Sequence, residues 1–362
     1  MLEAAIGGYE AVETRVDAIE QAYTDIATLV GSQTRNIAFV ENATVAYSQA
    51  LSSIAFERGD VILTSNNDYI SNQLMFLALA HRFGVEVVRA PDASEGGVDP
   101  EAVGALLGQR RPKLVAMTWI PTNSGLVQRV EEVGRLCRHY AVPYLVDACQ
   151  TVGQLPIDVE ALGCDFLCAT GRKFLRGPRG TGFLYVADRV LDAGLEPLFI
   201  DLRGAEWTAP DVYHPVSSAR RFENWEFAYA LLLGVGVAAR YANGLGIDVI
   251  SGRAIDLAAL TRTLLAELDG VRLLDRGVRL GAIVTLELPN TEPQTLLETL
   301  RHERINTSLS FRHYATIDFA EKEVEWALRV SPHYYNTAEE IHTLVEALRD
   351  ALSASGPRVS QA

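Results

Sequence analysis

The chain has 362 residues, 48% hydrophobic and 22% charged, so it can bury a large core, and two packed domains are expected. A formal net charge of −14 argues against nucleic acid or an anionic membrane surface as a partner. No signal peptide or membrane-spanning stretch is recognisable, which predicts a cytoplasmic protein. The cysteines lack the CxxC spacing of a metal site, so no metal is expected and reduced thiols are predicted at Cys137, Cys149, Cys164 and Cys168.

The first predicted element is an amphipathic helix from Glu10 to Val30, because its apolar residues keep helical spacing. A strand is predicted at Ile37–Val40, followed by a turn and a helix from Thr44 to Phe56. The N-terminus of that helix offers free N–H groups and a positive dipole end to an anion such as phosphate. A plain N-cap by Asn42 or Thr44 explains the same residues equally well.

Strands and helices then alternate, as is typical of a mostly parallel sheet covered by helices. Strands are predicted at Val61–Ser65, Val85–Arg89, Leu114–Trp119, Tyr144–Val146, Phe166–Ala169 and Phe183–Val186. Helices are predicted at Ser71–His81 and from Glu131 to Tyr144, and a further helix between them is predicted to end at Leu107. The pattern therefore predicts an α/β fold.

Two of these strands end in residues that suit a ligand site. Asp147 follows one strand, and Thr170, Arg172 and Lys173 follow the next. Open α/β sheets bind ligands at the carboxyl ends of their strands, and the glycine-rich turn GPRGTG beside these cations suits an anionic group. Taken alone, the turn is a weak signal because it matches neither a P-loop nor a dinucleotide fingerprint. A lone aspartate or lysine is also more often structural or solvated.

The C-terminal half predicts a second, smaller domain. Residues Val190–Ala219 lose any regular period and are expected to form an irregular rim. A long helix follows, and the domain limits are placed at 1–245 and 246–362. Within this half the predicted helices are Phe227–Asn243, Ile255–Leu268 and Glu292–Glu303, with strands near Arg272 and at Ile283–Leu288.

Three motifs follow one another in a specific order. They are DACQTVGQLPIDVEALGCDF with TGRKFLRGPRGTGFLYV at 147–186, RFENWE at 221–226 and RVSPHYYNTAEEI at 329–341. Together they resemble the class V aminotransferase family of pyridoxal-phosphate enzymes, which includes the cysteine desulfurases. The resemblance runs from about residue 36 to about residue 350. It implies fold type I, with a mostly parallel seven-stranded sheet between helices plus a smaller C-terminal α/β domain, and a homodimer with shared active sites.

The resemblance assigns roles to the residues of the first motif. Lys173 would carry pyridoxal phosphate covalently and act as general base, with a pKa lowered by burial and neighbouring cations. Asp147 would keep the pyridine nitrogen protonated. Gln150 matches the position that hydrogen-bonds the phenolic oxygen of the cofactor. Thr170 and Arg172 match phosphate-binding positions, where the family often has serine and histidine.

Other matched positions lie earlier in the chain. Ala43 and Thr44 match the phosphate turn of the family. Tyr69 stands where the family usually has a histidine stacked on the cofactor, a residue that also moves protons in desulfurases, so Tyr69 is a catalytic candidate with a different division of labour. Thr122 would contact the phenolic oxygen, and Asn123 the substrate. Plain turn and packing roles remain the alternatives for these residues.

Two further segments match on the C-terminal side. RFENWE corresponds to the part of family dimers that reaches into the neighbouring site beside the phosphate. Its usual glycine-threonine pair is replaced by Trp225-Glu226, so only the location carries over, with Asn224 or Trp225 as cofactor contacts. Arg329 matches the arginine that grips the α-carboxylate of the substrate, for which a guanidinium fork has the right geometry. A surface arginine is the alternative.

The chain also departs from the family. Between Ile305 and Asp318, where cysteine desulfurases carry a nucleophilic cysteine on a mobile loop, it has none. Ser310, Arg312 and His313 in this segment are candidates for shaping a different pocket, or are simply solvated. The early segment that usually precedes the first helix is also not recognised, which implies a more open pocket or a misassigned start.

These features are similar to the branch that contains the ergothioneine-pathway C–S lyase and isopenicillin N epimerase. The predicted reaction is β-elimination from a cysteine S-conjugate or sulfoxide, in which Lys173 removes the α-proton, sulfur leaves Cβ, and pyruvate and ammonia follow. Transamination and epimerisation are alternatives, because the same carbanion can be reprotonated elsewhere. A non-catalytic protein that keeps the fold is a further alternative. The leaving group and the stereochemistry at Cα are not set by the sequence.

Overall fold

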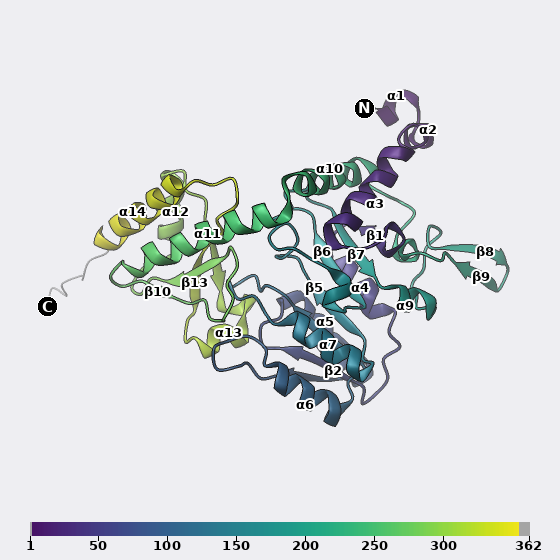
Figure 1. Ribbon diagram of the computed structural model, residues 1–362, viewed down its shortest axis with the longest axis horizontal. Helices are drawn as coiled ribbons and strands as arrows, with labels where there is room; N and C mark the ends of the chain where they lie inside the picture. The colour runs from purple at the N-terminus through teal and green to yellow at the C-terminus, as the bar shows by residue number, and fades with distance from the viewer. Residues whose placement is uncertain (1, 355–362) are drawn as a thin grey trace.

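Short runs of apolar and β-branched residues form a seven-stranded sheet at the centre of the larger part of the molecule (Figure 1). The computed structural model describes residues 2–354. The strand order is β1-β7-β6-β5-β4-β2-β3. The strands are β1 (Ile37–Val40), β2 (Val61–Ser65), β3 (Glu86–Ala90), β4 (Leu114–Thr118), β5 (Tyr144–Asp147), β6 (Phe166–Thr170) and β7 (Gly182–Val186). Every residue of these strands is buried except in β3, which lies at the edge of the sheet.

The sheet is mostly parallel, as the sequence predicts, with one reversed strand. Strands β2 to β6 run parallel to one another, whereas β7 pairs antiparallel with both β6 and β1. Antiparallel neighbours need no crossover helix, so the loop from Thr170 to Gly182 stays at the carboxyl end of β6. This geometry holds Lys173 at the edge where the parallel strands end.

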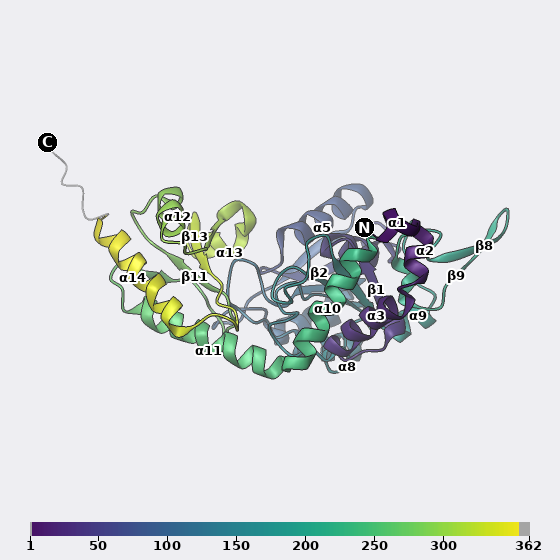
Figure 2. The ribbon, with the colours of Figure 1, turned by 90° about the horizontal axis from the view of Figure 1, so that it is seen from above.

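Helices cover both faces of this sheet (Figures 1 and 2). They are α1 (Leu2–Ile6), α2 (Gly8–Glu13), α3 (Val16–Val30), α4 (Ala43–Ser52), α5 (Ile70–Phe83), α6 (Pro100–Arg110), α7 (Val130–Tyr140), α8 (Val159–Leu162), α9 (Asp188–Asp192) and α10 (Tyr229–Leu245). The prediction of one helix over Glu10–Val30 was wrong, because the chain breaks between α2 and α3. There the Thr14 hydroxyl donates to the Ala11 carbonyl at 2.8 Å and competes with helix continuation.

A second, four-stranded sheet forms the core of the smaller part of the molecule. Its order is β10-β11-β13-β12, and all its pairs are antiparallel. The elements are β10 (Arg272–Leu273), β11 (Val284–Glu287), β12 (Ser308–Phe311) and β13 (Trp326–Val330), with α11 (Ile247–Ala266), α12 (Pro293–His302), α13 (Thr316–Glu321) and α14 (Ala338–Ala354). The segment 305–318, predicted as a loop, thus contains β12 and the start of α13. Ser310 lies buried in β12, and Arg312 pairs with Glu325 at 2.6 Å.

One residue joins the helices that link the two sheets. Gly246 lies between α10 and α11 with φ +87°, and the two helices meet at an angle of 84° (Figure 2). This junction lies where the sequence predicts the boundary between the two domains, after residue 245, and that boundary remains a prediction. No single helix within residues 2–354 is long and apolar enough to cross a membrane, and only α10 and α11 taken together meet those criteria of length and composition.

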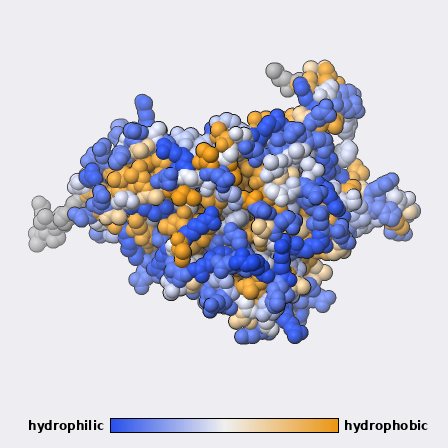
Figure 3. Space-filling view, in the orientation of Figure 1, coloured by the Kyte–Doolittle hydropathy of each residue, from blue (hydrophilic) through white to orange (hydrophobic). Residues whose placement is uncertain are grey.

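The stretch predicted as irregular contains regular structure. Besides α9 it forms a hairpin of β8 (Ala205–Ala209) and β9 (Val212–Pro215), which projects away from the body of the molecule (Figures 1 and 2). Trp207 is 76% exposed on this hairpin. Apolar side chains also reach the surface near α1, where Leu2 and Ile6 are exposed (Figure 3).

Candidate active site

A cavity of ≈ 260 Å³ lies where the parallel strands of the large sheet end and the small sheet approaches them. Its walls come from segments that follow β2, β4, β5 and β6, and from β13 with the turn after it. The lining residues are Tyr69, Thr122, Gln150, Arg172, Lys173, Phe174, Arg329, Ser331 and His333. Six of these nine residues are sequence-predicted site residues, although the nine are spread over most of the chain.

Lys173 is half-buried in this cavity. Its Nζ lies 5.7 Å from the centroid of the Tyr69 ring, and within residues 2–354 it makes no ion pair. Burial lowers the pKa of Lys173, and the nearby guanidinium groups of Arg329 and Arg172 lower it further, against the opposing effect of Asp147. A lowered pKa makes the neutral amine easier to form, which suits a nucleophile or a general base.

Asp147 lies at the carboxyl end of β5 and is 3% exposed. Its Oδ1 accepts a hydrogen bond from the Cys149 N–H at 2.9 Å, and its Oδ2 accepts one from Asn72 Nδ2, also at 2.9 Å. Asn72 Nδ2 also approaches Thr118 Oγ1 at 3.4 Å. A carboxylate with two fixed donors has a defined orientation, so Asp147 can present its remaining lone pairs to a ligand in one direction.

Arg329 stands in β13 and brings a second cation to the cavity. Its Nε donates to Ser331 Oγ at 3.0 Å and its Nη2 to Gln150 Oε1 at 3.5 Å, while Gln150 Nε2 donates to Thr122 Oγ1 at 3.1 Å. Burial, and then the charge of Arg172, lower the pKa of Arg329 to about 10. Neither arginine forms an ion pair with a carboxylate in the described part of the chain. Together with Lys173 they make a cavity that favours an anionic ligand.

A buried acid lies behind this wall. Asp68, next to Tyr69, accepts a hydrogen bond from Thr64 Oγ1, and its Oδ1 has no hydrogen-bond partner. Burial raises the pKa of Asp68 to about 7, and the charge of Asp147 contributes in the same direction. Asp68 can therefore change its protonation state near neutral pH, beneath the residues that line the cavity.

Several predicted site residues lie outside this cavity. The Thr170 hydroxyl donates to the Thr181 carbonyl at 3.1 Å, and the Asn123 amide donates to Asp318 Oδ2 at 2.7 Å. Ala43 and Thr44 begin α4, where Asn42 caps the helix by accepting from the Val45 N–H. The N-cap interpretation therefore describes the local geometry of this turn.

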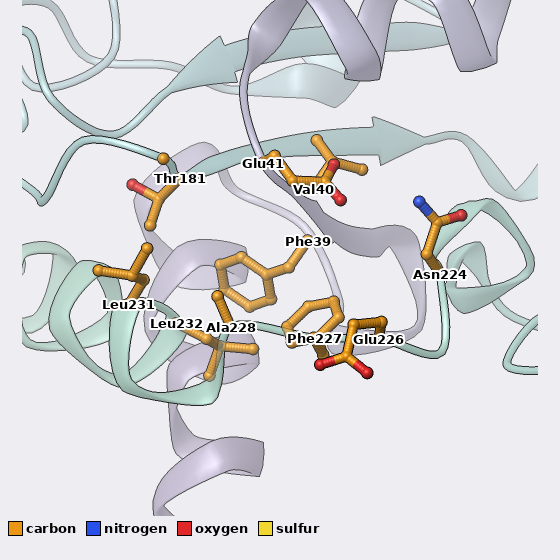
Figure 4. A pocket seen from close by; sticks show the side chains of 11 residues that line it. Phe39, Val40, Glu41, Thr181, Asn224, Glu226, Phe227, Ala228, Leu231 and Leu232 are labelled. Carbon is orange, nitrogen blue, oxygen red and sulfur yellow. The ribbon is translucent and has the colours of Figure 1, made fainter.

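The two residues predicted from RFENWE lie elsewhere again. Asn224 lines a second, much smaller cavity of ≈ 30 Å³, together with Phe39, Glu41 and Thr181 (Figure 4). Trp225 is 48% exposed, and its backbone N–H donates to Asp201 at 2.7 Å. Neither side chain lines the Lys173 cavity.

Sequence reasoning missed Phe174, Ser331 and His333 in the lining, and Asn72 behind it. The signal for His333 was present in the VSPHYYNT run, which was interpreted only through Arg329. Asn72 gave no signal, because an asparagine near the start of a helix is common. All four cysteines are free and buried, as predicted for reduced thiols. Burial, and then the charge of Asp147, raise the pKa of the Cys149 thiol far above its ordinary value.

Comparison with known proteins gives consistent matches over most of the chain. The family model "Aminotransferase class-V" matches residues 5–344. A protein of Methanothermobacter thermautotrophicus named "Probable cysteine desulfurase" is 30% identical over 95% of this chain and 86% of its own length. One of Mycobacterium tuberculosis named "Probable hercynylcysteine sulfoxide lyase" is 29% identical over 98% of this chain and 86% of its own length. The solved apo structure of a cysteine desulfurase from Thermococcus onnurineus NA1 superposes with a TM-score of 0.87 at 24% identity, covering 95% of this chain and 86% of that one.

Proposed function

The chain belongs to the class V aminotransferase family, and from that premise we propose that it cleaves a carbon–sulfur bond of an amino-acid substrate by β-elimination. It is a pyridoxal-phosphate enzyme of fold type I. The proposed substrates are cysteine S-conjugates or S-oxides. A cytoplasmic location stays a prediction from the sequence.

The residues around the cavity fit this cofactor. Lys173 is an amine with a lowered pKa and no ion-pair partner among the described residues, as a covalent attachment point requires. Asp147 would hold the pyridine nitrogen, and the Tyr69 ring would pack against the cofactor ring. Arg172 would bind the phosphate, and Gln150 with Thr122 would bind the phenolic oxygen. When bound, pyridoxal phosphate supplies an electron sink for the pair left at Cα.

Each side chain then has one task in the elimination. Arg329 binds the α-carboxylate of the substrate through its guanidinium fork, which fixes the Cα–H bond relative to Lys173. The neutral amine of Lys173 takes the proton from Cα. The electron pair of that bond forms the Cα–Cβ double bond as the Cβ–S bond breaks, and sulfur leaves with the pair of the broken bond. Addition of water then gives pyruvate and ammonia.

Residues 305–318 contain no cysteine, and this is the observation that favours elimination over sulfur transfer. Desulfurases need a nucleophilic thiol there, and in this chain the segment contains β12 and the start of α13. Cys149 does not replace it, because burial raises its thiol pKa and disfavours the thiolate. The sulfoxide-lyase name of the M. tuberculosis relative supports the same choice.

The names of other relatives support a second candidate, cysteine desulfuration. In that reaction cysteine yields alanine while its sulfur passes to an acceptor thiol as a persulfide. The two candidates differ in the carbon product, because elimination gives pyruvate and desulfuration gives alanine. Transamination and epimerisation give neither product from a sulfur substrate.

A homodimer with shared sites is part of the proposal. Large apolar residues are exposed around the β8–β9 hairpin and the RFENWE segment, namely Leu198, Phe199, Leu202, Trp207, Val212, Tyr213 and Trp225. A second copy of the chain that covers this surface would bring Asn224 or Trp225 to the neighbouring phosphate. Sedimentation velocity is expected to give twice the mass of one chain. A monomer that retains the cofactor and turns over would contradict the shared sites.

A product assay tests the reaction. The protein is loaded with pyridoxal phosphate and offered S-alkylcysteines, their sulfoxides and cysteine, and pyruvate, ammonia and alanine are measured without a keto-acid acceptor. Pyruvate in equal amount to the released sulfur product supports elimination. Alanine from cysteine, dependent on an added thiol, would move the protein to the desulfurases. Lys173→Ala serves as the inactive control for every product.

A further inference from the structure

The turn that follows β13 contacts the loop that carries Lys173 through a hydrogen bond and a stacked pair of rings. His333 Nε2 lies 3.1 Å from the Phe174 carbonyl oxygen, a contact between groups 159 residues apart in the chain. The imidazole also stacks on the Phe174 ring, with centroids 5.3 Å apart and planes 23° apart. Both rings are buried, so this contact is shielded from water.

A second contact holds the outer part of the same loop. Arg176 Nη1 donates to Tyr334 Oη at 2.8 Å, and its guanidinium carbon lies 4.9 Å from the centroid of the Tyr335 ring. The Arg176 backbone has φ +63°, which residues other than glycine rarely adopt. A strained conformation persists when surrounding contacts hold it, and the loop that bears Lys173 is held from the turn at residues 331–336.

Hydrogen bonds also fix the tautomer of His333. The Tyr334 N–H donates to Nδ1 at 3.0 Å, so Nδ1 is the acceptor and the proton lies on Nε2, where it is donated to Phe174. The turn is closed by Asn336, whose Oδ1 accepts from the His333 N–H at 2.8 Å. Burial lowers the pKa of His333 to about 4, so the imidazole is neutral over the working range of most enzymes. His333 is thus a permanent donor rather than an acid or base.

We propose that His333 is a positioning residue. Its Nε2–H holds the loop at residues 173–177, and so keeps Lys173 at a fixed position relative to Arg329. Lys173 immediately precedes Phe174, and Arg329 lies four residues before His333 on the adjoining strand. One hydrogen bond therefore connects the peptide beside the amine to the segment that carries the guanidinium. The inference rests on the proposed function, because the roles of Lys173 and Arg329 come from it.

Two substitutions of His333 separate its donor from its ring. His333→Gln keeps an N–H donor near the position of Nε2 and loses the stacking, whereas His333→Phe keeps the stacking and loses the donor. Arg176→Ala tests the outer contact, with Arg179→Ala as a control, since Arg179 is exposed and lies in the same loop. All variants are studied as full-length protein loaded with pyridoxal phosphate.

For His333→Phe, kcat is expected to fall about 10-fold or more with KM within about threefold, because a displacement near 1 Å costs up to about 100-fold. His333→Gln is expected to recover to within about threefold of the unchanged protein. The pH midpoint of the absorbance change of the bound cofactor should move by about 0.5 unit or more in His333→Phe only. Thermal unfolding midpoints should agree to about 2 °C, which separates positioning from a loss of folding.

Two results would overturn the inference: an unchanged kcat and absorbance midpoint in His333→Phe, or the same loss in His333→Gln as in His333→Phe. If the unchanged protein forms neither pyruvate nor alanine, the proposed reaction fails by itself. The absorbance midpoint then still decides whether the Nε2–H controls the surroundings of Lys173, because it requires no turnover.

Discussion

Replacing Glu223 by alanine tests the network that holds the RFENWE segment against the large sheet. Glu223 is 1% exposed and accepts three hydrogen bonds, from Tyr23 Oη at 2.7 Å, the Phe39 N–H at 2.8 Å and Arg203 Nε at 2.5 Å. Alanine would leave a guanidinium, a hydroxyl and a backbone N–H without their acceptor, in a place that water reaches poorly. Loss of one partner of a buried ion pair costs about 3–5 kcal/mol.

The magnitude is open to a direct measurement. With a urea slope of about 3 kcal/mol/M, that loss lowers the unfolding midpoint by roughly 1–1.7 M. Glu226→Ala is the matched control, because Glu226 is exposed and lies three residues away. Glu223→Gln should lie between the two, since its amide oxygen can still accept from Tyr23 and Phe39 but its NH₂ group would face Arg203. A midpoint for Glu223→Ala equal to that of the control would refute the reasoning.

Three further predictions concern the active site. Lys173→Ala is expected to abolish turnover and cofactor fixation by borohydride, as judged by peptide mass spectrometry, and activity of this variant comparable to the unchanged protein would contradict its role. Asn72→Ala removes a donor to Asp147 and should weaken cofactor retention about 10-fold or more in equilibrium dialysis, whereas equal retention would show that the contact is dispensable. Asp68 has a raised folded pKa of about 7, so its contribution to stability is fully present at pH below its unfolded pKa of about 4 and is lost as the pH rises to about 7. Unfolding free energies of the unchanged protein should fall over this window relative to Asp68→Asn, and parallel curves would contradict the assignment.

The strands and the residues at their ends could be predicted because their signals are local. Val61–Ser65 was predicted with the bounds that β2 has, since a short apolar run bounded by turn residues has few other solutions. Lys173 was found because it follows such a run closely, and Gln150 because it matches a position of the family motif. Their meeting in one cavity follows from parallel strands that end at a common edge.

The rest depends on contacts that spacing along the chain does not encode. Asn72 and Asp147 are 75 residues apart, and the local sequence around either residue does not indicate that the two form a hydrogen bond. The hairpin at Ala205–Pro215 was missed because its strands are short and mostly exposed, so no apolar alternation marks them. The break at Thr14 was missed because the apolar spacing of α3 continues backwards into α2 without a glycine or proline between them.

A small rotation at Gly246 is magnified along α11, which links the two sheets. Only this residue separates α10 from α11, and its positive φ is one that side chains rarely permit. The 20 residues of α11 make a stiff arm about 30 Å long, so a rotation of about 5° at the joint would carry its far end through about 2.6 Å. The distance between the guanidinium of Arg329 on β13 and the amine of Lys173 after β6 therefore depends in part on the backbone torsions of Gly246.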